Sequence, residues 1–285
     1  YYARVNGFGA NTNAYRIRYD LVADFRLPFV IQADGYPVTN VSNTPLSVYV
    51  DDPTIGKGVL HWIEESSQGS GVYTIMQYNS TLPDARPITI AEDVILAGTI
   101  HASGHQVVWS AFDGNDNEIF LYDGVEVRQL TQNNRDDRNP RISGDRVVWQ
   151  GQVPRSGVWP LVFEIFQYDH DGVQQLTSNS FYDNVHPQID GNLIVWNQEM
   201  AGHFGLLNNQ IMAYDGHVSV IGYGNLARTD CSGVFSGCRP ERQIANGRIV
   251  YTVNTQAGSA GRQIWYWDTY SWEPRLLFEF SGFSF

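Results

Sequence analysis

The sequence predicts an all-β fold, a six-bladed β-propeller made of four-stranded antiparallel blades. A four-strand pattern recurs about every 47 residues along the 285-residue chain (285 divided by six). Every clear copy contains a glycine turn and a strand that ends in an aromatic residue, and no segment carries a helical stripe of apolar residues. Repeated units of four antiparallel strands are typical of a propeller, whose blades pack radially because one blade cannot bury both of its faces.

The composition fits this fold and narrows the range of partners. Hydrophobic residues make up 42% of the chain, aromatic residues 13% and charged residues only 17%, which suits small sheets packed face to face and argues against disorder. The net charge of −12 disfavours nonspecific binding to nucleic acid or to an anionic membrane surface. No apolar run reaches the roughly 18 residues of a membrane-spanning helix, so we expect no membrane insertion.

The second strand of each predicted blade anchors the repeat. It ends in Trp62, Trp109, Trp149, Trp196 or Tyr251, and a turn glycine precedes it at Gly58, Gly104, Gly144, Gly191 or Gly247. The first strands are predicted around residues 53–55, 100–102, 140–142, 187–189 and 242–244. The third strands are predicted at 72–78, 118–122, 164–168, 210–214 and 263–267, and the fourth at 87–90, 127–131, 173–177, 218–221 and 275–278. We expect the recurring tryptophans to fill the core between blades.

The N-terminal portion follows the same register less regularly. Residues 28–35 and 37–41 match the third and fourth strands, which leaves residues 15–19 as the second strand and residues 3–5 as the first. The predicted blades of one propeller domain therefore span residues 1–46, 47–92, 93–132, 133–179, 180–228 and 229–285.

The repeat also resembles a known family. The pattern Pro-x-Ile-Ser-Gly-Asp-Arg-Val-Val-Trp, followed by Glu-Ile-Phe-x-Tyr-Asp and Gln-Leu-Thr, resembles the TolB-like family of six-bladed β-propellers over at least five of the six units. The family's usual Ser-Pro-Asp-Gly turn is replaced here by Ser-Gly-Asp, Asp-Gly-Asn or Ala-Asn-Gly, which indicates a divergent branch. The superfamily includes binding proteins, peptidase propellers and polysaccharide lyases, so the resemblance implies the fold and leaves the function open.

Ligand-binding candidates lie in two predicted places. On the face of the longer loops, Trp159 and Phe204 are candidates for stacking on a sugar ring. In the innermost strands, the position before a recurring isoleucine is polar, and such a ring could line the central channel and bind a polar ligand. The residues at this position are Thr54, His101, Arg141, Gln188 and Gln243. The alternative is that they hydrogen-bond to neighbouring blades or to channel water.

The sequence contains no linear catalytic motif. None of its seven histidines forms a metalloprotease pair, and no Gly-x-Ser-x-Gly elbow occurs. Because propeller lyases assemble His, Arg and Tyr from separate blades, His101, Arg141 and Tyr182 are the constellation to test for an enzyme. Convergence of His101 and Arg141 on one open pocket would favour catalysis, and burial in contacts with neighbouring blades would disfavour it.

No cofactor is expected. The loop that begins at Asp113 resembles a calcium loop but lacks the ligand spacing of one, so a solvated hairpin loop is the favoured interpretation of Asp113 and Asp116. Asp137 and Asp183 precede equivalent strands, where they either cap a turn or share a cation. Calcium at these four residues is the alternative.

Two features predict an exported protein, whether secreted, periplasmic or on the cell surface. Cys231 and Cys238 lie seven residues apart in a Gly/Ser-rich loop and are too few to bind structural zinc, which favours a disulfide over two free thiols and hence an oxidising compartment. The chain begins at Tyr1 with no leader segment, as a processed chain would. Asn40 and Asn79 match the glycosylation pattern, which matters only in a eukaryotic secretory host.

The expected function is that of an exported, non-catalytic binding or structural module for a glycan or a protein partner. One alternative is a polysaccharide lyase or glycoside-processing enzyme with its site at the channel mouth. The other is a subunit of an extracellular surface assembly or filament, in which the aromatic residues of 278–285 dock onto a partner.

Overall fold

The computed structural model describes residues 30–33, 36–39, 41–42, 44, 50–154, 161–178, 182–200, 210–223, 244–254, 261–271 and 273–281. These residues form strands and turns, with no helix among them. The described residues accordingly contain no helix long and apolar enough to cross a membrane.

Five four-stranded antiparallel sheets follow one another along the chain, and the strands of each sheet pair in sequence order. The β3–β6 sheet holds β3 (Val50–Gly56), β4 (Val59–Glu65), β5 (Tyr73–Asn79) and β6 (Ile88–Val94). The β7–β10 sheet holds β7 (His101–Ser103), β8 (Gln106–Phe112), β9 (Asn117–Tyr122) and β10 (Val127–Gln129). The β11–β14 sheet holds β11 (Asp137–Ser143), β12 (Arg146–Pro154), β13 (Leu161–Asp169) and β14 (Gly172–Gln175). The β15–β18 sheet holds β15 (Tyr182–Asp190), β16 (Leu193–Met200), β17 (Gln210–Tyr214) and β18 (Val218–Tyr223). The β19–β22 sheet holds β19 (Ile244–Ala245), β20 (Arg248–Asn254), β21 (Gly261–Asp268) and β22 (Arg275–Ser281).

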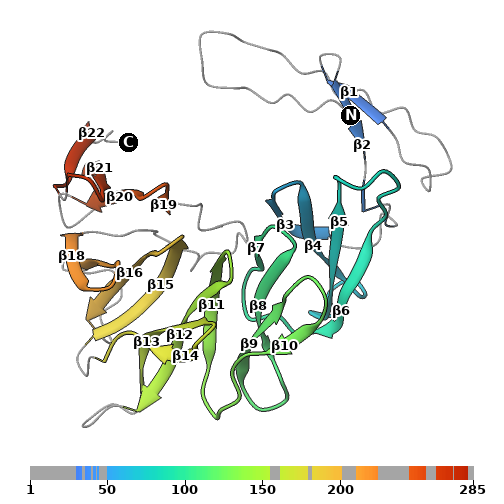
Figure 1. The fold of residues 1–285 in the computed structure, drawn as a ribbon, viewed down its shortest axis with the longest axis horizontal. Helices are drawn as coiled ribbons and strands as arrows, with labels where there is room; N and C mark the ends of the chain where they lie inside the picture. Colours follow the sequence, from blue (N-terminus) through green and yellow to red (C-terminus); the bar gives the residue numbers. More distant parts are fainter. Residues whose placement is uncertain are drawn as a thin grey trace.

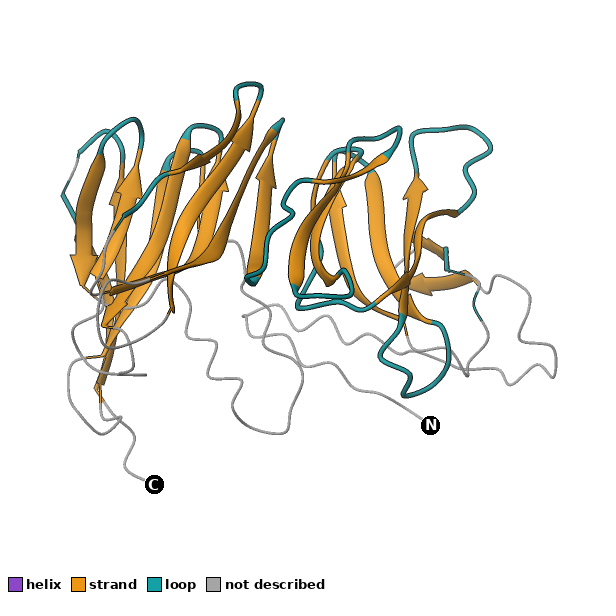
Figure 2. Cartoon of the chain, turned by 90° about the horizontal axis from the view of Figure 1, so that it is seen from below, coloured by secondary structure: helices purple, strands orange, loops and turns teal. Residues whose placement is uncertain are grey.

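The sheets succeed one another around an arc, with the first strand of each sheet toward the inside (Figure 1). Neighbouring first strands contact one another across the junctions between sheets. A view turned by 90° shows the strands running between two ends that carry the loops (Figure 2). The prediction of an all-β propeller is therefore confirmed for the described residues.

Glycine in a left-handed conformation makes the turn between the first and second strand of each four-stranded sheet. The backbone φ angle lies between +57° and +81° at Gly58, Gly104, Gly144, Gly191 and Gly247. A side chain disfavours this region of φ, and glycine reaches it without steric cost. The glycines predicted to turn the chain ahead of each anchor strand do so.

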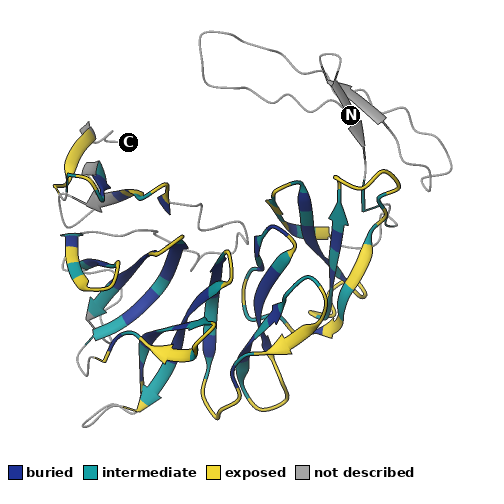
Figure 3. Ribbon diagram, in the orientation of Figure 1, coloured by how far each residue is buried: buried dark blue, intermediate teal, exposed yellow. Residues whose placement is uncertain are grey.

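The core lies between the sheets. Trp109, Trp149 and Trp196 are at most 2% exposed. Buried positions recur along the strands of successive sheets (Figure 3). Four apolar clusters each combine residues from two consecutive sheets; one of them joins Ile119 of β9 to Ile142 of β11. Burial between blades, predicted for the tryptophans, is confirmed, since removal of such large apolar surfaces from water is the main force that joins sheets.

An irregularity that the sequence did not predict recurs in three first strands. The pairing register shifts at Asp52, Asn139 and His186, each of which precedes a proline and has a φ angle between +52° and +56°. Asp, Asn and His are the side chains that tolerate this left-handed region best after glycine. The resulting β-bulge bends the innermost strand two residues before the predicted polar ring.

The N-terminal portion is described only in part. β1 (Val30–Ala33) and β2 (Tyr36–Thr39) form an antiparallel pair. β1 lies within the predicted third strand of the first blade, and β2 begins one residue before the predicted fourth strand. The strands predicted at residues 3–5 and 15–19 lie outside the described residues. The count of six blades and the blade boundaries stay predictions.

Candidate functional site

The predicted polar ring occupies one register position in four sheets. Thr54, His101, Arg141 and Gln188 each pair with the residue before the anchor tryptophan of their own sheet. The position lies near the tight-turn end of the strand, three residues before Gly144 in the case of Arg141. Arg141 and Gln188 are buried, whereas Thr54 and His101 are half-buried. Gln243 lies outside the described residues.

Arg141 is a buried cation near charged and titratable groups of other sheets. Its Nη1 donates a hydrogen bond of 2.8 Å to the carbonyl oxygen of Pro140. Burial lowers the pKa of Arg141 to about 10, and the negative charge of Asp52 opposes that shift. Burial, and secondarily the charge of Arg141, lowers the pKa of His186. Titratable groups from three sheets therefore influence one another at the inner strands.

The residues considered for catalysis from the sequence lie on the first strands of three consecutive sheets: His101 on β7, Arg141 on β11 and Tyr182 on β15. The ring atom Nδ1 of His101 accepts a hydrogen bond of 3.2 Å from the backbone N–H of Ile142 in the next sheet. Tyr182 begins β15, six residues before the ring position, which is roughly 20 Å along an extended strand. The burial of Arg141 and the hydrogen bond of His101 to the next sheet count against one open pocket at these two residues, and their catalytic role stays a prediction.

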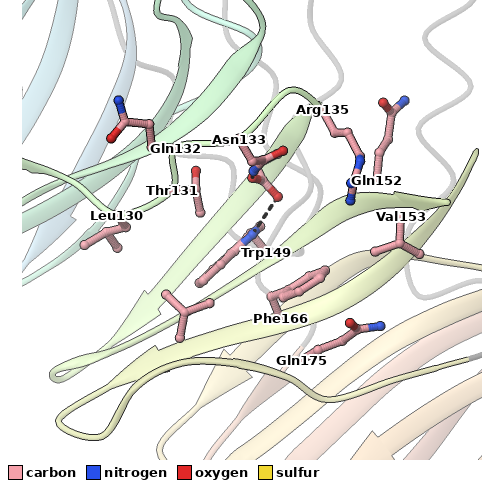
Figure 4. A pocket seen from close by; sticks show the side chains of 12 residues that line it. Leu130, Thr131, Gln132, Asn133, Arg135, Trp149, Gln152, Val153, Phe166 and Gln175 are labelled. Carbon is pink, nitrogen blue, oxygen red and sulfur yellow. Dashed lines mark hydrogen bonds between the residues drawn. The ribbon is translucent and has the colours of Figure 1, made fainter.

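A pocket opens instead between the β7–β10 and β11–β14 sheets; we call it the inter-sheet pocket. Its volume is about 360 Å³, within the range of small-molecule sites. One wall is the segment after β10, and the other is formed by β12, β13 and β14 (Figure 4). The lining residues are Leu130, Thr131, Gln132, Asn133, Arg135, Asp137, Trp149, Gln152, Val153, Phe166, Val173 and Gln175.

The floor of the inter-sheet pocket is aromatic. The rings of Trp149 and Phe166 stack with centroids 5.9 Å apart and an interplanar angle of 14°. The indole Nε1 of Trp149 donates a hydrogen bond of 2.9 Å to Oδ1 of Asp137, the interaction drawn in Figure 4. Gly151 leaves room for this arrangement, because a Cβ atom there would collide with Oδ1 of Asp137 and with the Phe166 ring.

Two buried carboxyl groups meet beside this floor. Burial raises the pKa of Glu118 to about 7 against hydrogen bonds from Thr131 and Asn133, and the charges of Asp137 and Asp116 raise it further. Burial also raises the pKa of Asp137, although hydrogen bonds from Asn133 and Trp149 oppose the rise. Perturbed carboxyl groups beside a cleft mark a candidate functional site.

The remaining predicted residues fall in several places. Oδ1 of Asp113 accepts hydrogen bonds from the backbone N–H groups of Asn115 (2.9 Å) and Asp116 (3.3 Å), which holds the β8–β9 loop. Oδ1 of Asp183 accepts a 2.9 Å hydrogen bond from the backbone of Phe163 in the preceding sheet. Trp159, Phe204, Cys231, Cys238 and Asn40 lie outside the described residues.

The inter-sheet pocket was not found from the sequence, although Asp137 was among the candidates. A signal existed in the repeat itself. Asp137 of β11 and Asn184 of β15 hold the same register position, each two residues beyond the tryptophan on the paired strand. This position holds an acid, Asp137, beside the inter-sheet pocket and an amide, Asn184, at the next junction between sheets.

Comparison with known proteins supports the fold. The chain is similar to TolB from Acinetobacter baumannii at 18% sequence identity and a TM-score of 0.48, over 86% of this chain and 58% of that one. It is similar to a prolyl endopeptidase at 12% identity and a TM-score of 0.56, over 100% of this chain and 40% of that one. It is similar to a puromycin hydrolase at 14% identity and a TM-score of 0.55, over 96% and 44%.

The chain thus spans between two fifths and three fifths of the length of these three proteins. No family model and no curated protein matches the sequence. At such low identity the likeness concerns the β-propeller architecture and carries no information about activity.

Proposed function

We propose that the chain is an exported, non-catalytic binding module whose ligand is a glycan held in the inter-sheet pocket. The observation that carries the proposal is the chemistry of the lining. Four primary amides, those of Gln132, Asn133, Gln152 and Gln175, surround an aromatic floor. Primary amides both donate and accept hydrogen bonds, as sugar hydroxyls require.

The apolar part of the pocket suits the other side of a sugar. The C–H faces of a pyranose ring pack on aromatic and aliphatic surfaces such as those of Phe166 and Val173. A mostly apolar concavity with a few convergent polar groups is the usual form of a small-ligand site. Arg135 adds an exposed guanidinium to the lining, so acidic as well as neutral glycans belong in a binding test.

A non-catalytic role is supported by the state of the ring residues. Arg141 is 5% exposed and His101 is hydrogen-bonded to the next sheet. General acid–base chemistry requires a group within hydrogen-bond reach of the substrate. We therefore expect the ligand to be bound without being cleaved.

A panel of neutral and acidic polysaccharides tests the proposal by glycan array, followed by calorimetric titration of the hits. Gln152→Ala and Gln175→Ala should each weaken binding about tenfold, since each removes hydrogen bonds worth roughly 1–1.5 kcal/mol. Gln174→Ala is the matched control, because Gln174 precedes Gln175 on β14 and points to the other face of the sheet. Binding to no glycan, or equal losses in all three variants, would refute the pocket assignment; release of unsaturated oligosaccharides would favour the lyase alternative.

Export belongs to the same proposal and has a separate test. It is supported by the spacing of Cys231 and Cys238, as expected for a loop disulfide in an oxidising compartment. Alkylation of the purified chain before and after reduction should label these two thiols only after reduction. Labelling without reduction would remove the support for export and leave the glycan proposal untouched.

A further inference from the structure

A second site lies beside the inter-sheet pocket, where the β8–β9 loop meets the start of β9. Asp113, Asp116 and Glu118 each place a carboxylate oxygen within 4.8 Å of those of the other two. Asp113 is exposed, Asp116 is half-buried and Glu118 is fully buried. The cluster therefore runs from solvent into the junction between the β7–β10 and β11–β14 sheets.

The inner oxygens of this cluster lack hydrogen-bond donors. Oε1 of Glu118 accepts a 2.6 Å hydrogen bond from the backbone N–H of Asn133, but Oε2 has no partner among the described residues. Both side-chain oxygens of Asp116 are also buried without a partner in that part of the chain. Carboxylate oxygens removed from water need a proton, a donor or a cation, because an uncompensated buried charge costs several kcal/mol.

The next junction shows how the fold satisfies the same position. Glu164 occupies in β13 the place that Glu118 occupies in β9, opposite the residue two beyond the tryptophan. Its Oε2 accepts a hydrogen bond from Oγ1 of Thr177 and one of 2.8 Å from Nδ2 of Asn184. Glu164 thus has a donor from the adjacent sheet.

The junction that holds Glu118 differs from the junction that holds Glu164 in one residue of the adjacent sheet: Asp137 in the first and Asn184 in the second. Asn184 and Asp137 both accept a hydrogen bond from the indole of the paired strand's tryptophan, at 2.8 Å from Trp196 and 2.9 Å from Trp149. The other atom of the side chain is an amide nitrogen in Asn184 and a carboxylate oxygen in Asp137. The donor that would neutralise Glu118 is therefore replaced by a second acceptor.

We propose that Asp113, Asp116 and Glu118 bind one calcium ion, which compensates the buried carboxylate of Glu118 as the amide donor of Asn184 compensates Glu164 at the next junction. The ligand atoms are all carboxylate oxygens, the donor type that a hard divalent cation prefers. Asp137 contributes negative charge next to Glu118. Calcium fits better than magnesium because its coordination is flexible and its oxygens can come partly from loop carbonyls and water.

The contacts of Asp113 leave one of its oxygens available to a cation. Oδ1 of Asp113 accepts hydrogen bonds from the backbone of its own loop, and the one hydrogen bond to its Oδ2 from the described residues is that of Gln129, at 3.3 Å. Asn133, whose backbone contacts Glu118, also lines the inter-sheet pocket. The ion site does not require a ligand in that pocket.

The test is calorimetric titration of the full-length chain, stripped with a chelator, with calcium chloride and with magnesium chloride. We expect one calcium site with Kd between about 10⁻⁵ and 10⁻³ M and at least tenfold weaker binding of magnesium. Asp113→Asn and Asp116→Asn should each weaken calcium binding at least tenfold, and Asp137→Asn should weaken it less. Glu164→Gln is the matched control and should leave calcium binding unchanged.

Thermal unfolding with and without calcium provides the second readout, since an ion that binds only the folded state raises Tm. Asp113 lies on an exposed loop, so its variant keeps the test decisive if a core variant fails to fold. No calcium heat in the wild-type chain would overturn the proposal, as would full affinity in both loop variants. A wild-type Tm that rises on acidification but ignores calcium would assign the buried position to a shared proton instead.

Discussion

Asn184→Asp tests how much stability is lost when a second carboxyl group is buried between two sheets. Asn184 is fully buried; its Nδ2 donates to Oε2 of Glu164 at 2.8 Å, and its Oδ1 accepts from Trp196 at 2.8 Å and Gln198 at 3.2 Å. The substitution keeps the volume and replaces the donor by an acid. Between the β11–β14 and β15–β18 sheets it therefore creates a pair of acids equivalent to Glu118 and Asp137, which lie between the β7–β10 and β11–β14 sheets.

The expected loss in the free energy of unfolding is set by whichever protonation state of the introduced carboxyl group has the lower free energy. If ionised, it lies beside Glu164 and costs about 4 kcal/mol for charges 4 Å apart at an effective dielectric of 20, besides the lost donor, worth about 1–3 kcal/mol. If protonated, it still donates to Glu164, and holding the proton at pH 7 against an ordinary pKa near 3.9 costs about 4 kcal/mol. The protonated state is cheaper, so we expect a loss of about 4 kcal/mol at pH 7.

The pH dependence separates this explanation from simple misfitting. The pKa of the introduced carboxyl is raised in the folded state, so its proton is bound more tightly there and stability falls as pH rises above about 4. The loss should shrink to about 1.5 kcal/mol at pH 5.

Urea unfolding at pH 7 and pH 5 measures both numbers. Asn192→Asp, at an exposed turn, adds the same charge and should change stability by less than about 0.5 kcal/mol. A loss below 1 kcal/mol at pH 7, or an equal loss at both pH values, would refute the reasoning.

Three further predictions concern other junctions and the inner strands. Burial lowers the pKa of His61 to about 4. The free energy of unfolding should therefore fall by about 3 kcal/mol as the pH drops from 6.5 to 4, because the unfolded chain binds the proton more tightly. Urea unfolding across this range should show a smaller fall for His61→Gln than for the wild-type chain. In Gly56→Ala the new Cβ would lie 2.5 Å from the backbone nitrogen of Gly104 in the next sheet, so we expect a loss of roughly 1–3 kcal/mol, and an unchanged Tm would contradict the close approach. A double-mutant cycle of Asp52→Asn and Arg141→Met should give a coupling energy of about 0.5–3 kcal/mol, and additive losses would mean that the two charges do not interact.

Much of the fold was predictable because its determinants are local in sequence. A turn glycine, a strand ending in tryptophan and an Asp-Gly hairpin all lie within one repeat, so their spacing reveals the unit. Gly144 and Trp149 illustrate this, since the first has the positive φ angle and the second the burial that the pattern requires.

The candidate site was less predictable because it depends on contacts between repeats. The inter-sheet pocket joins residues 130–137 to residues of β12, β13 and β14, and its depth depends on how two sheets pack. The bulges were missed for a different reason. The residue before a proline is normally extended, so the left-handed φ angles of Asp52 and Asn139 contradict the usual expectation for Asp-Pro and Asn-Pro.

Comparison of one third-strand position across the sheets shows which residues the fold itself requires there. The third-strand position that holds Glu118 and Glu164 is occupied by Gln210 in the β15–β18 sheet, where it pairs with the residue two beyond Trp196. An amide therefore satisfies this position as far as the sheet is concerned. Glu118 facing Asp137 is then a departure that costs stability in the absence of a compensating charge, and such departures concentrate at functional sites. The junction that departs is also the one that borders the inter-sheet pocket, so the cation proposal and the glycan proposal place function at the same junction from independent observations.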